Sequence, residues 1–332
     1  MSRFAQRYAY LRRLVDRRLS SVVKHSEPRD LADASRYILR GGGKRVRSTL
    51  VLLSCEAVGG RVQDAIDAAV AVEMLHNFTL VHDDVMDNAP TRRGRATVHT
   101  RWNLNTAILV GDTVLGLAYR SLLRSTTPNI RRAAQLFTEG FIDVCEGQAF
   151  DLEYERRRII TLQDYYRMIG KKTGKLIATA TELGGLLGNG SLQEVDALRT
   201  FGTKIGRAFQ IQDDLLDVVA DAKAFGKTIG GDIVEGKKTF LLVQAFQYAR
   251  GTDRKVLRPL MAGQTPPATH AARKRLIATI TDIYQRCGAI EAARNQIRRE
   301  TAAGIRALHA LRPTIARDML QWFSEMLVQR NF

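Results

Sequence analysis

Apolar residues recur every three to four positions along almost the whole chain, which is the period of an amphipathic α-helix. We expect no strand, because no run of β-branched residues is bounded by turn residues. The predicted helices cover the ranges 1–23, 29–39, 48–58, 64–87, 105–119, 130–158, 161–187 and 192–219, and most of the chain after 270. The pattern therefore predicts an all-α fold, and nothing divides residues 1–332 into more than one large helical domain.

Glycine and proline residues separate these helices and mark the loops. Loops that combine glycine with lysine or arginine are expected over 41–47, 88–97 and 225–239. The last of these does not match the GxxxxGK[ST] phosphate-binding motif, but it is long enough and basic enough to close over a phosphate. We also expect Gly111 and Asp112 to interrupt the helix over 105–119, and a surface loop around a short helix over 250–270.

The composition narrows the class of protein. The hydrophobic fraction of 45% is ample for a core. The three cysteines (Cys55, Cys145 and Cys287) are odd in number and far apart, so neither a disulfide framework nor a zinc site is predicted. The N-terminal segment has no apolar run of signal-peptide length, and no stretch approaches the ~18 apolar residues of a membrane span. We therefore expect a cytoplasmic protein without a transmembrane segment.

The net charge of +17 suits a partner that is a nucleic acid, an anionic membrane or a phosphorylated small molecule. No helix-turn-helix, zinc finger or RNP-like aromatic run supports nucleic acid, so no nucleic-acid partner is predicted. Transient contact with a membrane surface stays open. The excess charge gathers at 41–47, 92–95 and 226–238, which favours a polyphosphate ligand.

The densest group of possible ligands is Asp83, Asp84 and Asp87, at the end of the helix predicted over 64–87. Residues four apart lie on one face of a helix, so Asp83 and Asp87 stack one turn apart. Carboxylate oxygens at this density suit Mg²⁺ or Mn²⁺, with waters and ligand phosphates completing the coordination. Taken alone, one such cluster is more often a solvated helix face.

A second cluster, Asp213, Asp214 and Asp217, repeats this spacing after another apolar segment. Two apolar helices that each end in three carboxylates indicate a cleft, and facing helices would form a cage for several Mg²⁺ ions. Arg92 and Arg93 follow the first cluster, and guanidinium groups pair with phosphate in fork geometry. The two clusters and these arginines together predict a site for metal-bridged phosphates.

These motifs, in this order, resemble the trans-isoprenyl diphosphate synthases of the polyprenyl synthetase family. The resemblance extends from about Gly41 to Thr239 and weakly beyond. It rests on GGKRVR at 42–47, the two DDxxD motifs, RRG at 92–94, GQAFDL at 147–152, KTG at 172–174, FQIQDD at 209–214 and the glycine-rich segment 226–239. It implies a helical domain of the isoprenoid synthase type, with antiparallel helices around a deep central cavity, in a homodimer.

The resemblance also implies a role for each matching residue. Isopentenyl diphosphate would be bound by Lys44, Arg47, His76 and Arg93. The allylic diphosphate (C5 to C15) would be bound by Arg92, Lys172, Lys227 and Lys237, with Thr173 and Gln210 beside the allylic cation. About three Mg²⁺ ions, replaceable by Mn²⁺, would be ligated by Asp83, Asp87 and Asp213, and Asp84, Asp214 and Asp217 would assist directly or through water. Ser48 stands where the family usually has proline, and we expect little effect from that difference.

Residue types alone agree with this chemistry. Breaking an allylic C–O bond leaves a carbocation and a diphosphate, and metal ions and cationic side chains stabilise the charge on the leaving group. The carbocation needs a pocket from which water is excluded. We find no Ser-His or Cys-His arrangement, so no nucleophilic side chain is predicted.

Product length would depend on the residues just before Asp83. Thr79 and Phe78 lie four and five positions before it, about 6–7.5 Å along a helix axis, and Leu75 lies one turn deeper. In the family, an aromatic residue at the fifth position acts as a floor for the growing chain, and aromatics at both positions favour a C15 product. With one aromatic and one small residue, we predict geranylgeranyl diphosphate (C20), with farnesyl diphosphate (C15) as the alternative.

Two other function classes remain. A class I terpene cyclase would use the first Asp motif, but it normally lacks the second and the residues matching Lys44, Arg47 and Arg93. An inactive partner subunit would usually have lost some aspartates, and all six are present here.

Overall fold

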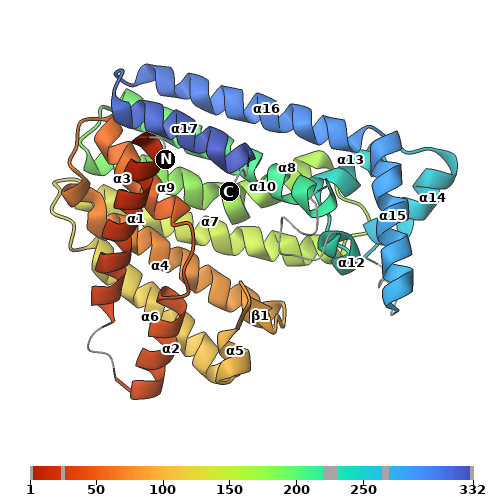
Figure 1. Ribbon diagram of the computed structural model, residues 1–332, viewed down its shortest axis with the longest axis horizontal. Coiled ribbons are helices and arrows are strands. Elements are labelled where there is room, and N and C mark those ends of the chain that lie inside the picture. Colours follow the sequence, from red (N-terminus) through yellow and green to blue (C-terminus); the bar gives the residue numbers. More distant parts are fainter. Residues whose placement is uncertain (1–2, 24–26, 220–229, 264–268, 330–332) are drawn as a thin grey trace. The chain divides into compact units, whose positions relative to one another are not determined.

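The structure is a computed structural model that describes residues 3–23, 27–219, 230–263 and 269–329 (Figure 1). Helices dominate it, which confirms the all-α prediction. The chain divides into two compact units. Unit 1 contains Met1–Phe141, Leu176–Thr200 and Ala307–Trp322, and unit 2 contains Ile142–Lys175, Phe201–Arg306 and Phe323–Phe332.

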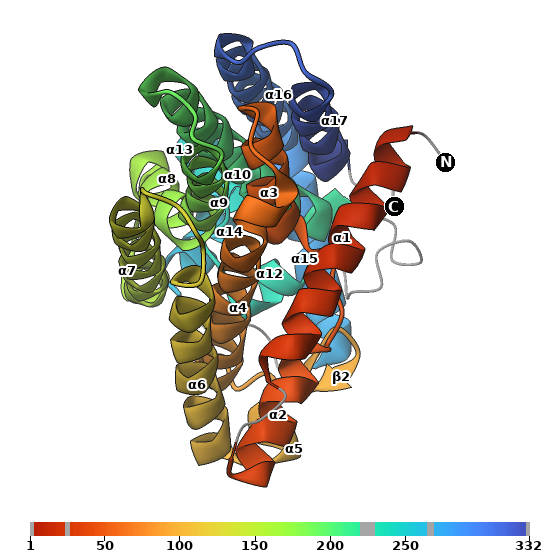
Figure 2. The same cartoon turned by 90° about the vertical axis from the view of Figure 1, so that its left-hand side faces the viewer.

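Unit 1 is organised around one buried helix. Helix α4 (Val62–Met86) contacts each of the helices α1 (Arg3–Val22), α2 (Arg29–Leu39), α3 (Val46–Ala57), α5 (Val98–Arg101) and α6 (Leu104–Leu122). All residues from 68 to 75 are buried, and all of them except Glu73 are apolar, as expected for a helix that is packed on every side. Figures 1 and 2 both show α6 lying along α4. The first Asp motif is at the C-terminal end of this helix.

Gly111 and Asp112 do not interrupt α6, so that expectation was wrong. Gly111 lies against the imidazole of His82 on α4, and a Cβ atom at this position would lie 2.1 Å from His82 Nε2. The glycine therefore allows α4 and α6 to approach closely, and α6 continues through it without a break. The His82 Nε2 atom lies 3.3 Å from the backbone oxygen of Ile108, which agrees with a structural role for this histidine.

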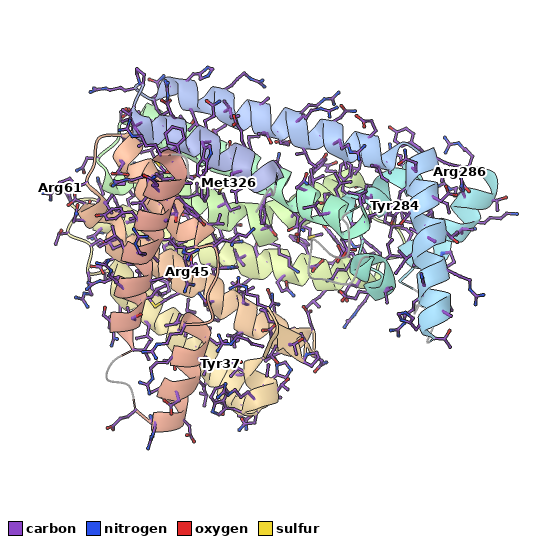
Figure 3. All side chains as sticks on the ribbon, in the orientation of Figure 1. Tyr37, Arg45, Arg61, Tyr284, Arg286 and Met326 are labelled. Carbon is purple, nitrogen blue, oxygen red and sulfur yellow. The ribbon has the colours of Figure 1, made fainter. Side chains whose placement is uncertain are left out.

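Unit 2 is built around a core of aromatic and aliphatic side chains. Its shorter elements are α8 (Leu162–Ile169), a π-helix (Gly170–Gly174), α12 (Gly231–Glu235), α13 (Phe240–Tyr248), α14 (Gly251–Met261) and α15 (His270–Arg286). Helix α13 contacts α8, α14 and α15. Tyr165 and Phe240 meet edge to face with ring centroids 5.9 Å apart, and Tyr284, labelled in Figure 3, is fully buried. The short helix expected within the range 250–270 is α14, and it takes up about half of that range.

The remaining helices have residues in both units. They are α7 (Ile130–Arg156), α9 (Lys175–Leu187), α10 (Leu192–Val219), α16 (Ala289–Ala307) and α17 (Ile315–Gln329), with a 3₁₀ turn at Leu308–Ala310. The sequence pattern predicted α7 and α10 to within two residues. The second Asp motif lies near the C-terminal end of α10, on residues that belong to unit 2.

Candidate active site

Arg92 and Arg93 lie on a β-hairpin, where the sequence predicted only a loop. Strand β1 (Thr91–Arg92) pairs antiparallel with β2 (Arg95–Ala96), so the expectation of no strand was wrong at this point. The two turn residues, Arg93 and Gly94, have φ angles of 53° and 72°. Positive φ at both central residues defines a type I′ turn, which suits a two-residue hairpin. The turn fixes the backbone that carries both arginines.

Tyr37 on α2 supports this hairpin, and sequence reasoning missed it. Its hydroxyl donates a hydrogen bond to the backbone oxygen of Ala96 at 2.8 Å. The guanidinium groups of Arg95 and Arg101 lie over its ring, 3.9 and 4.5 Å from the centroid. Cation–π contacts of this kind hold the strand against α2. Figure 3 labels Tyr37 in unit 1.

Within the first Asp motif, the three carboxylates have different surroundings. Asp84 is only 3% exposed and accepts a hydrogen bond from Arg92 Nε at 2.6 Å. Burial raises the pKa of Asp84, and the charge of Arg92 opposes that rise. Asp83 is half-buried, and Asp87 is exposed at the end of α4. The structure thus makes Asp84 the anchor of Arg92 and leaves Asp83 and Asp87 as the carboxylates of this motif that reach solvent.

A cluster of arginines surrounds His76. Arg47 Nη1 lies 3.1 Å from His76 Nε2, and Arg93 Nη1 donates to the backbone oxygen of Gly42 at 2.9 Å. The Nε atom of Arg47 is buried and has no hydrogen-bond partner among the described atoms. Lys44 is exposed at the start of this segment, and its backbone oxygen accepts a hydrogen bond from Tyr8. Lys44, Arg47, His76 and Arg93, which the sequence assigned to one diphosphate, are all in unit 1, and we call them the isopentenyl half-site.

His76 is expected to stay neutral well below pH 6.5. Burial and the charges of nearby arginines, Arg47 first, lower the pKa of its imidazole well below the usual value. In the unfolded chain this histidine takes up a proton as the pH falls through about 6.5, and in the folded chain it does not. His76 therefore contributes stability above that pH which is lost on acidification, with a slope of up to about 1.4 kcal/mol per pH unit.

The measurement is the difference in unfolding free energy between the wild-type protein and His76→Gln, taken from denaturant curves at pH 7.5, 6.5 and 5.5. We expect the wild-type protein to lose stability relative to His76→Gln as the pH falls. A difference that stays constant over this range would show that His76 has the same pKa in the folded and the unfolded protein, and would contradict the expectation.

The residues expected to limit product length are also in unit 1. Leu75 is fully buried, and Phe78 is 7% exposed. The ring of Phe78 contacts Phe141, with centroids 5.5 Å apart, and His82, with centroids 4.6 Å apart. Thr79 is half-buried, and its hydroxyl donates to the backbone oxygen of His76 at 2.9 Å. Phe78 is thus held in one position by two neighbouring rings.

In unit 2, Asp214 is the buried carboxylate of the second Asp motif. It is 4% exposed and accepts hydrogen bonds from the Tyr165 hydroxyl at 2.7 Å, the Phe240 backbone N–H at 2.9 Å and Gln210 Nε2 at 2.9 Å. Burial raises the pKa of Asp214 to about 6, and these three donors oppose the rise. Asp213 is half-buried. The middle aspartate is therefore a structural anchor in both motifs.

The Lys-Lys-Thr-Gly segment forms a π-helical turn inside the helix predicted over 161–187. Gln210 and Thr173 meet through a hydrogen bond from Thr173 Oγ1 to Gln210 Oε1 at 2.8 Å. Lys172 donates to Asp151 on α7. Gly147 on α7 packs against this turn, since a Cβ atom there would lie 2.2 Å from the Lys172 nitrogen. A single π-turn inside an α-helix is frequent at functional sites.

Lys171 faces different partners from its neighbour Lys172. Its ammonium group contacts Asp143 and Glu146 on α7, and Asp143 also pairs with Lys175 at 2.7 Å. The wider π-turn thus separates two adjacent lysines onto two groups of carboxylates. The sequence did not identify Asp143 or Asp151 as partners of these lysines.

The segment after α10 supplies a further carboxylate. Asp217 Oδ2 accepts from the Asp232 backbone N–H at 3.0 Å, and Lys237 Nζ lies 3.6 Å from Asp232 Oδ1 and 2.6 Å from Glu235 Oε2. Burial and the neighbouring carboxylates, Asp214 first, raise the pKa of Asp232 to about 7. Lys172, Thr173, Gln210, the three aspartates and Lys237 are all in unit 2, and we call them the allylic half-site. Lys227 lies outside the described residues, and Arg92 belongs to unit 1.

These carboxylates fit Mg²⁺ only together with other ligands. Within the described ranges, no group of three or more His, Cys, Asp or Glu side chains is arranged to hold a metal ion by itself. Mg²⁺ usually keeps several waters and binds through one or two carboxylates and the phosphates of a substrate. Oxygen donors that reach solvent beside arginines and lysines are suited to that mode of binding.

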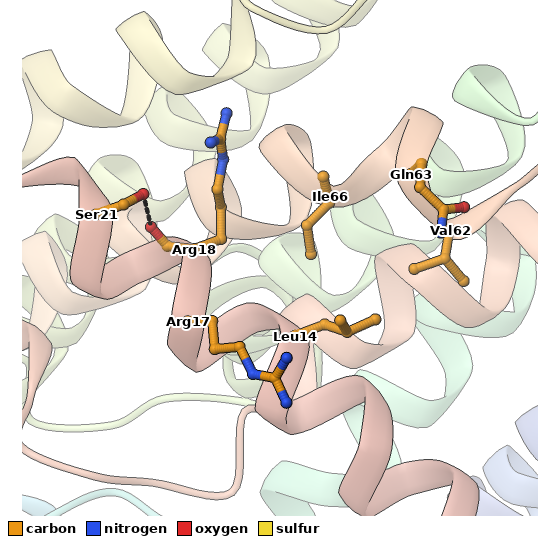
Figure 4. A pocket seen from close by; sticks show the side chains of 7 residues that line it. All are labelled: Leu14, Arg17, Arg18, Ser21, Val62, Gln63 and Ile66. Atoms are coloured by element: carbon orange, nitrogen blue, oxygen red, sulfur yellow. Dashed lines mark hydrogen bonds between the residues drawn. The ribbon is translucent and has the colours of Figure 1, made fainter.

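A separate cavity lies elsewhere in unit 1. Its volume is about 360 Å³, and it lies between the last turns of α1 and the first turns of α4 (Figure 4). Leu14, Val62 and Ile66 give it an apolar lining, and Arg17 and Arg18 stand at its edge. Ile66 and Asp83 are about 25 Å apart along α4. No carboxylate lines this cavity, so its lining offers no carboxylate ligand for a metal ion.

Known proteins are similar to this chain in sequence and in fold. The family model described as polyprenyl synthetase matches residues 28–280. A short chain isoprenyl diphosphate synthase from Methanothermobacter thermautotrophicus is 37% identical over 319 residues, which cover 96% of each chain. A geranylgeranyl diphosphate synthase from Methanosarcina mazei is 34% identical and covers 96% of this chain and 95% of its own length. The crystal structure of geranylgeranyl pyrophosphate synthetase from Pyrococcus horikoshii Ot3 superposes with a TM-score of 0.92 at 35% identity, covering 99% of this chain and 100% of that one.

Proposed function

The chain belongs to the polyprenyl synthetase family, and on that premise we propose that it condenses isopentenyl diphosphate with allylic diphosphates of C5 to C15, in the presence of Mg²⁺, to give all-trans geranylgeranyl diphosphate (C20). It is a trans-prenyltransferase with the helical fold of the isoprenoid synthases. We propose further that residues 1–332 act as one catalytic domain, in a cytoplasmic homodimer. None of the described helices is both long enough and apolar enough to span a membrane.

One observation carries the proposal: the guanidinium group of Arg47 is buried beside His76 with its Nε atom unpaired. A buried donor without an acceptor costs about 1–3 kcal/mol. No ion pair between Arg47 and a carboxylate is found in the described part of the chain, so a ligand with negatively charged oxygens is a suitable acceptor. A diphosphate has the charge and the oxygens to do so, and Arg93 and Lys44 are on the same half-site.

The reaction needs binding, orientation and the stabilisation of charge. As the allylic C–O bond breaks, its electron pair stays with the leaving diphosphate, which Arg92, Lys172 and Lys237 would hold. Bound Mg²⁺ would neutralise part of that charge and would be held by Asp83, Asp87 and Asp213. The hydroxyl of Thr173 and the amide oxygen of Gln210 would face the positive charge left on the allylic carbons.

The second substrate then supplies the new bond. The double bond of isopentenyl diphosphate attacks the allylic carbon, and one proton leaves to restore a double bond. No side chain is required as its acceptor, because the released diphosphate is basic enough. Lys44, Arg47 and Arg93 would hold the diphosphate of isopentenyl diphosphate, which is not broken.

The experiment is a diphosphate-release assay on the purified protein. With Mg²⁺, release should require both substrates together and should stop when EDTA removes the metal. Release from the allylic substrate alone would favour a terpene cyclase. No release under any of these conditions, from a folded protein, would favour an inactive partner subunit.

Phe78→Ala is expected to lengthen the product by at least one C5 unit. The ring is held in place by Phe141 and His82, so its removal opens space five residues before Asp83. Product length is read by mass spectrometry. Val81→Ala is the matched control, because Val81 is also buried on α4 but is not one of the residues assigned to the floor. Equal product lengths in Phe78→Ala and the wild type would refute the floor.

A further inference from the structure

The segment that carries Lys44 and Arg47 contains a residue with an unfavourable backbone conformation. Arg45 has φ 51° and ψ 38°, which is the left-handed region, and it stands immediately before α3. A non-glycine residue in this region costs of order 1 kcal/mol and persists only where its surroundings hold it. This backbone turn sets the direction of the chain on its two sides, where Lys44 and Arg47 of the isopentenyl half-site lie.

The side chain of Arg45 is what holds the turn. It is 4% exposed, and three of its nitrogens donate hydrogen bonds. Nε donates to Asp16 Oδ1 at 2.8 Å, Nη1 to Glu73 Oε1 at 3.1 Å and Nη2 to the backbone oxygen of Leu39 at 3.0 Å. These acceptors belong to α1, α4 and α2, so one guanidinium group ties the turn to three helices. Figure 3 labels Arg45.

Glu73 on α4 links this guanidinium group to the start of α3. Its side chain is 6% exposed, and its second oxygen, Oε2, accepts a hydrogen bond from the Ser48 hydroxyl at 2.9 Å. Ser48 is fully buried. A buried carboxylate is stable only when paired and hydrogen-bonded, and here the two oxygens bind residues on either side of Arg47.

The charge of Glu73 also acts on the cations around it. Burial of Arg45 favours loss of its proton, but the carboxylates of Glu73 and Asp16 outweigh this effect and raise the pKa of Arg45. Burial lowers the pKa of Arg47 to about 10, and the charge of Glu73 opposes that change. Glu73 is thus a buried countercharge to the arginines when no diphosphate is bound.

We propose that Glu73 is a positioning residue for isopentenyl diphosphate: acting through Arg45 and Ser48, it fixes the backbone of residues 44–47, so that Lys44 and Arg47 are held ready for the diphosphate. The proposal rests on the function proposed above. It also replaces the expectation that serine instead of proline at position 48 has little effect, because proline has no hydroxyl to donate to Glu73.

The test compares substrate affinities in Glu73→Gln, Ser48→Ala and a matched control. Glu73→Gln keeps the shape and removes the charge, and we expect it to raise the KM for isopentenyl diphosphate about tenfold. Ser48→Ala removes one hydrogen bond, and we expect an increase of about threefold. The KM for the allylic substrate and the kcat at saturation should stay within about twofold of wild type.

Asp67→Asn is the control. Asp67 is also on α4, six residues before Glu73, and pairs with an arginine of α1, Arg18, at 2.7 Å. It should leave both KM values unchanged. Equal increases in both KM values in Glu73→Gln, or an unchanged KM for isopentenyl diphosphate in Glu73→Gln or in Ser48→Ala, would overturn the proposal.

Two further results separate this proposal from folding and from the proposed function. If Glu73→Gln does not fold, Ser48→Ala decides, because it removes only a hydroxyl. If the wild-type protein does not condense the two substrates, the proposed function fails, and calorimetry with inorganic diphosphate then tests the positioning. If inorganic diphosphate binds Ser48→Ala about threefold more weakly than the wild type, the positioning role of Glu73 is supported. Equal binding of diphosphate to both proteins would exclude that role.

Discussion

Replacing Asp214 by leucine is expected to lower the melting temperature by about 5–10 °C, whereas the same change at Asp213 lowers it by less than about 2 °C. The buried carboxylate of Asp214 accepts hydrogen bonds from Tyr165, Gln210 and the backbone N–H of Phe240. Leucine leaves these donors without an acceptor, and the backbone N–H of Phe240 cannot turn to another one. Asp213 is half-buried and adjacent, so it is a close control.

Asp214→Asn separates hydrogen bonding from charge. Its amide oxygen still accepts from Phe240, and Gln210 can turn its own amide to match, so most of the stability should return. The measurement is thermal unfolding of the three variants and the wild type without substrate. Equal losses at Asp213 and Asp214 would contradict the assignment of Asp214 as the anchor.

Arg92→Gln is expected to lower kcat about 10²–10³-fold at saturating substrates. Its guanidinium group is held at 2.6 Å from the buried carboxylate of Asp84, on a hairpin with a fixed turn. A cation held in place before the reaction stabilises a leaving diphosphate more than a mobile one does, because no reorganisation is needed when the charge develops. Loss of one such group weakens the stabilisation of the transition state more than it weakens substrate binding.

Arg95→Gln is the matched control for Arg92→Gln. Arg95 is on the same hairpin and has the same charge, but it lies over the ring of Tyr37 instead of pairing with Asp84. We expect its kcat to fall by less than about threefold. Similar losses at both positions would show that the hairpin as a whole, and not the pairing of Arg92, matters for the reaction.

The sequence predicted the parts of this structure that depend on local pattern. Helix α2 has the predicted bounds, 29–39, because Pro28 precedes it and three glycines follow soon after it. Each half-site contains residues that the motifs indicated. The spacing of the Asp motifs also placed their carboxylates correctly at the ends of apolar helices.

Contacts between distant residues could not be predicted in the same way. The two aspartates that begin each motif look alike in sequence, and only the structure shows that the second of each pair is buried on a partner, Arg92 for Asp84 and Tyr165 for Asp214. Arg45 and Glu73 are 28 residues apart, so no local pattern links them. The π-turn at Gly170–Gly174 has the composition of an ordinary helix and depends on packing against α7.

The most direct test of the central claim is an elongation assay that reads product length. The protein is supplied with Mg²⁺ and isopentenyl diphosphate, and separately with C5, C10 and C15 allylic diphosphates, and the products are identified by mass spectrometry. The account predicts an all-trans C20 diphosphate from each starter. A C15 end point would keep the reaction and move the floor closer to Asp83. No condensation with any starter, from a folded protein, would contradict the account.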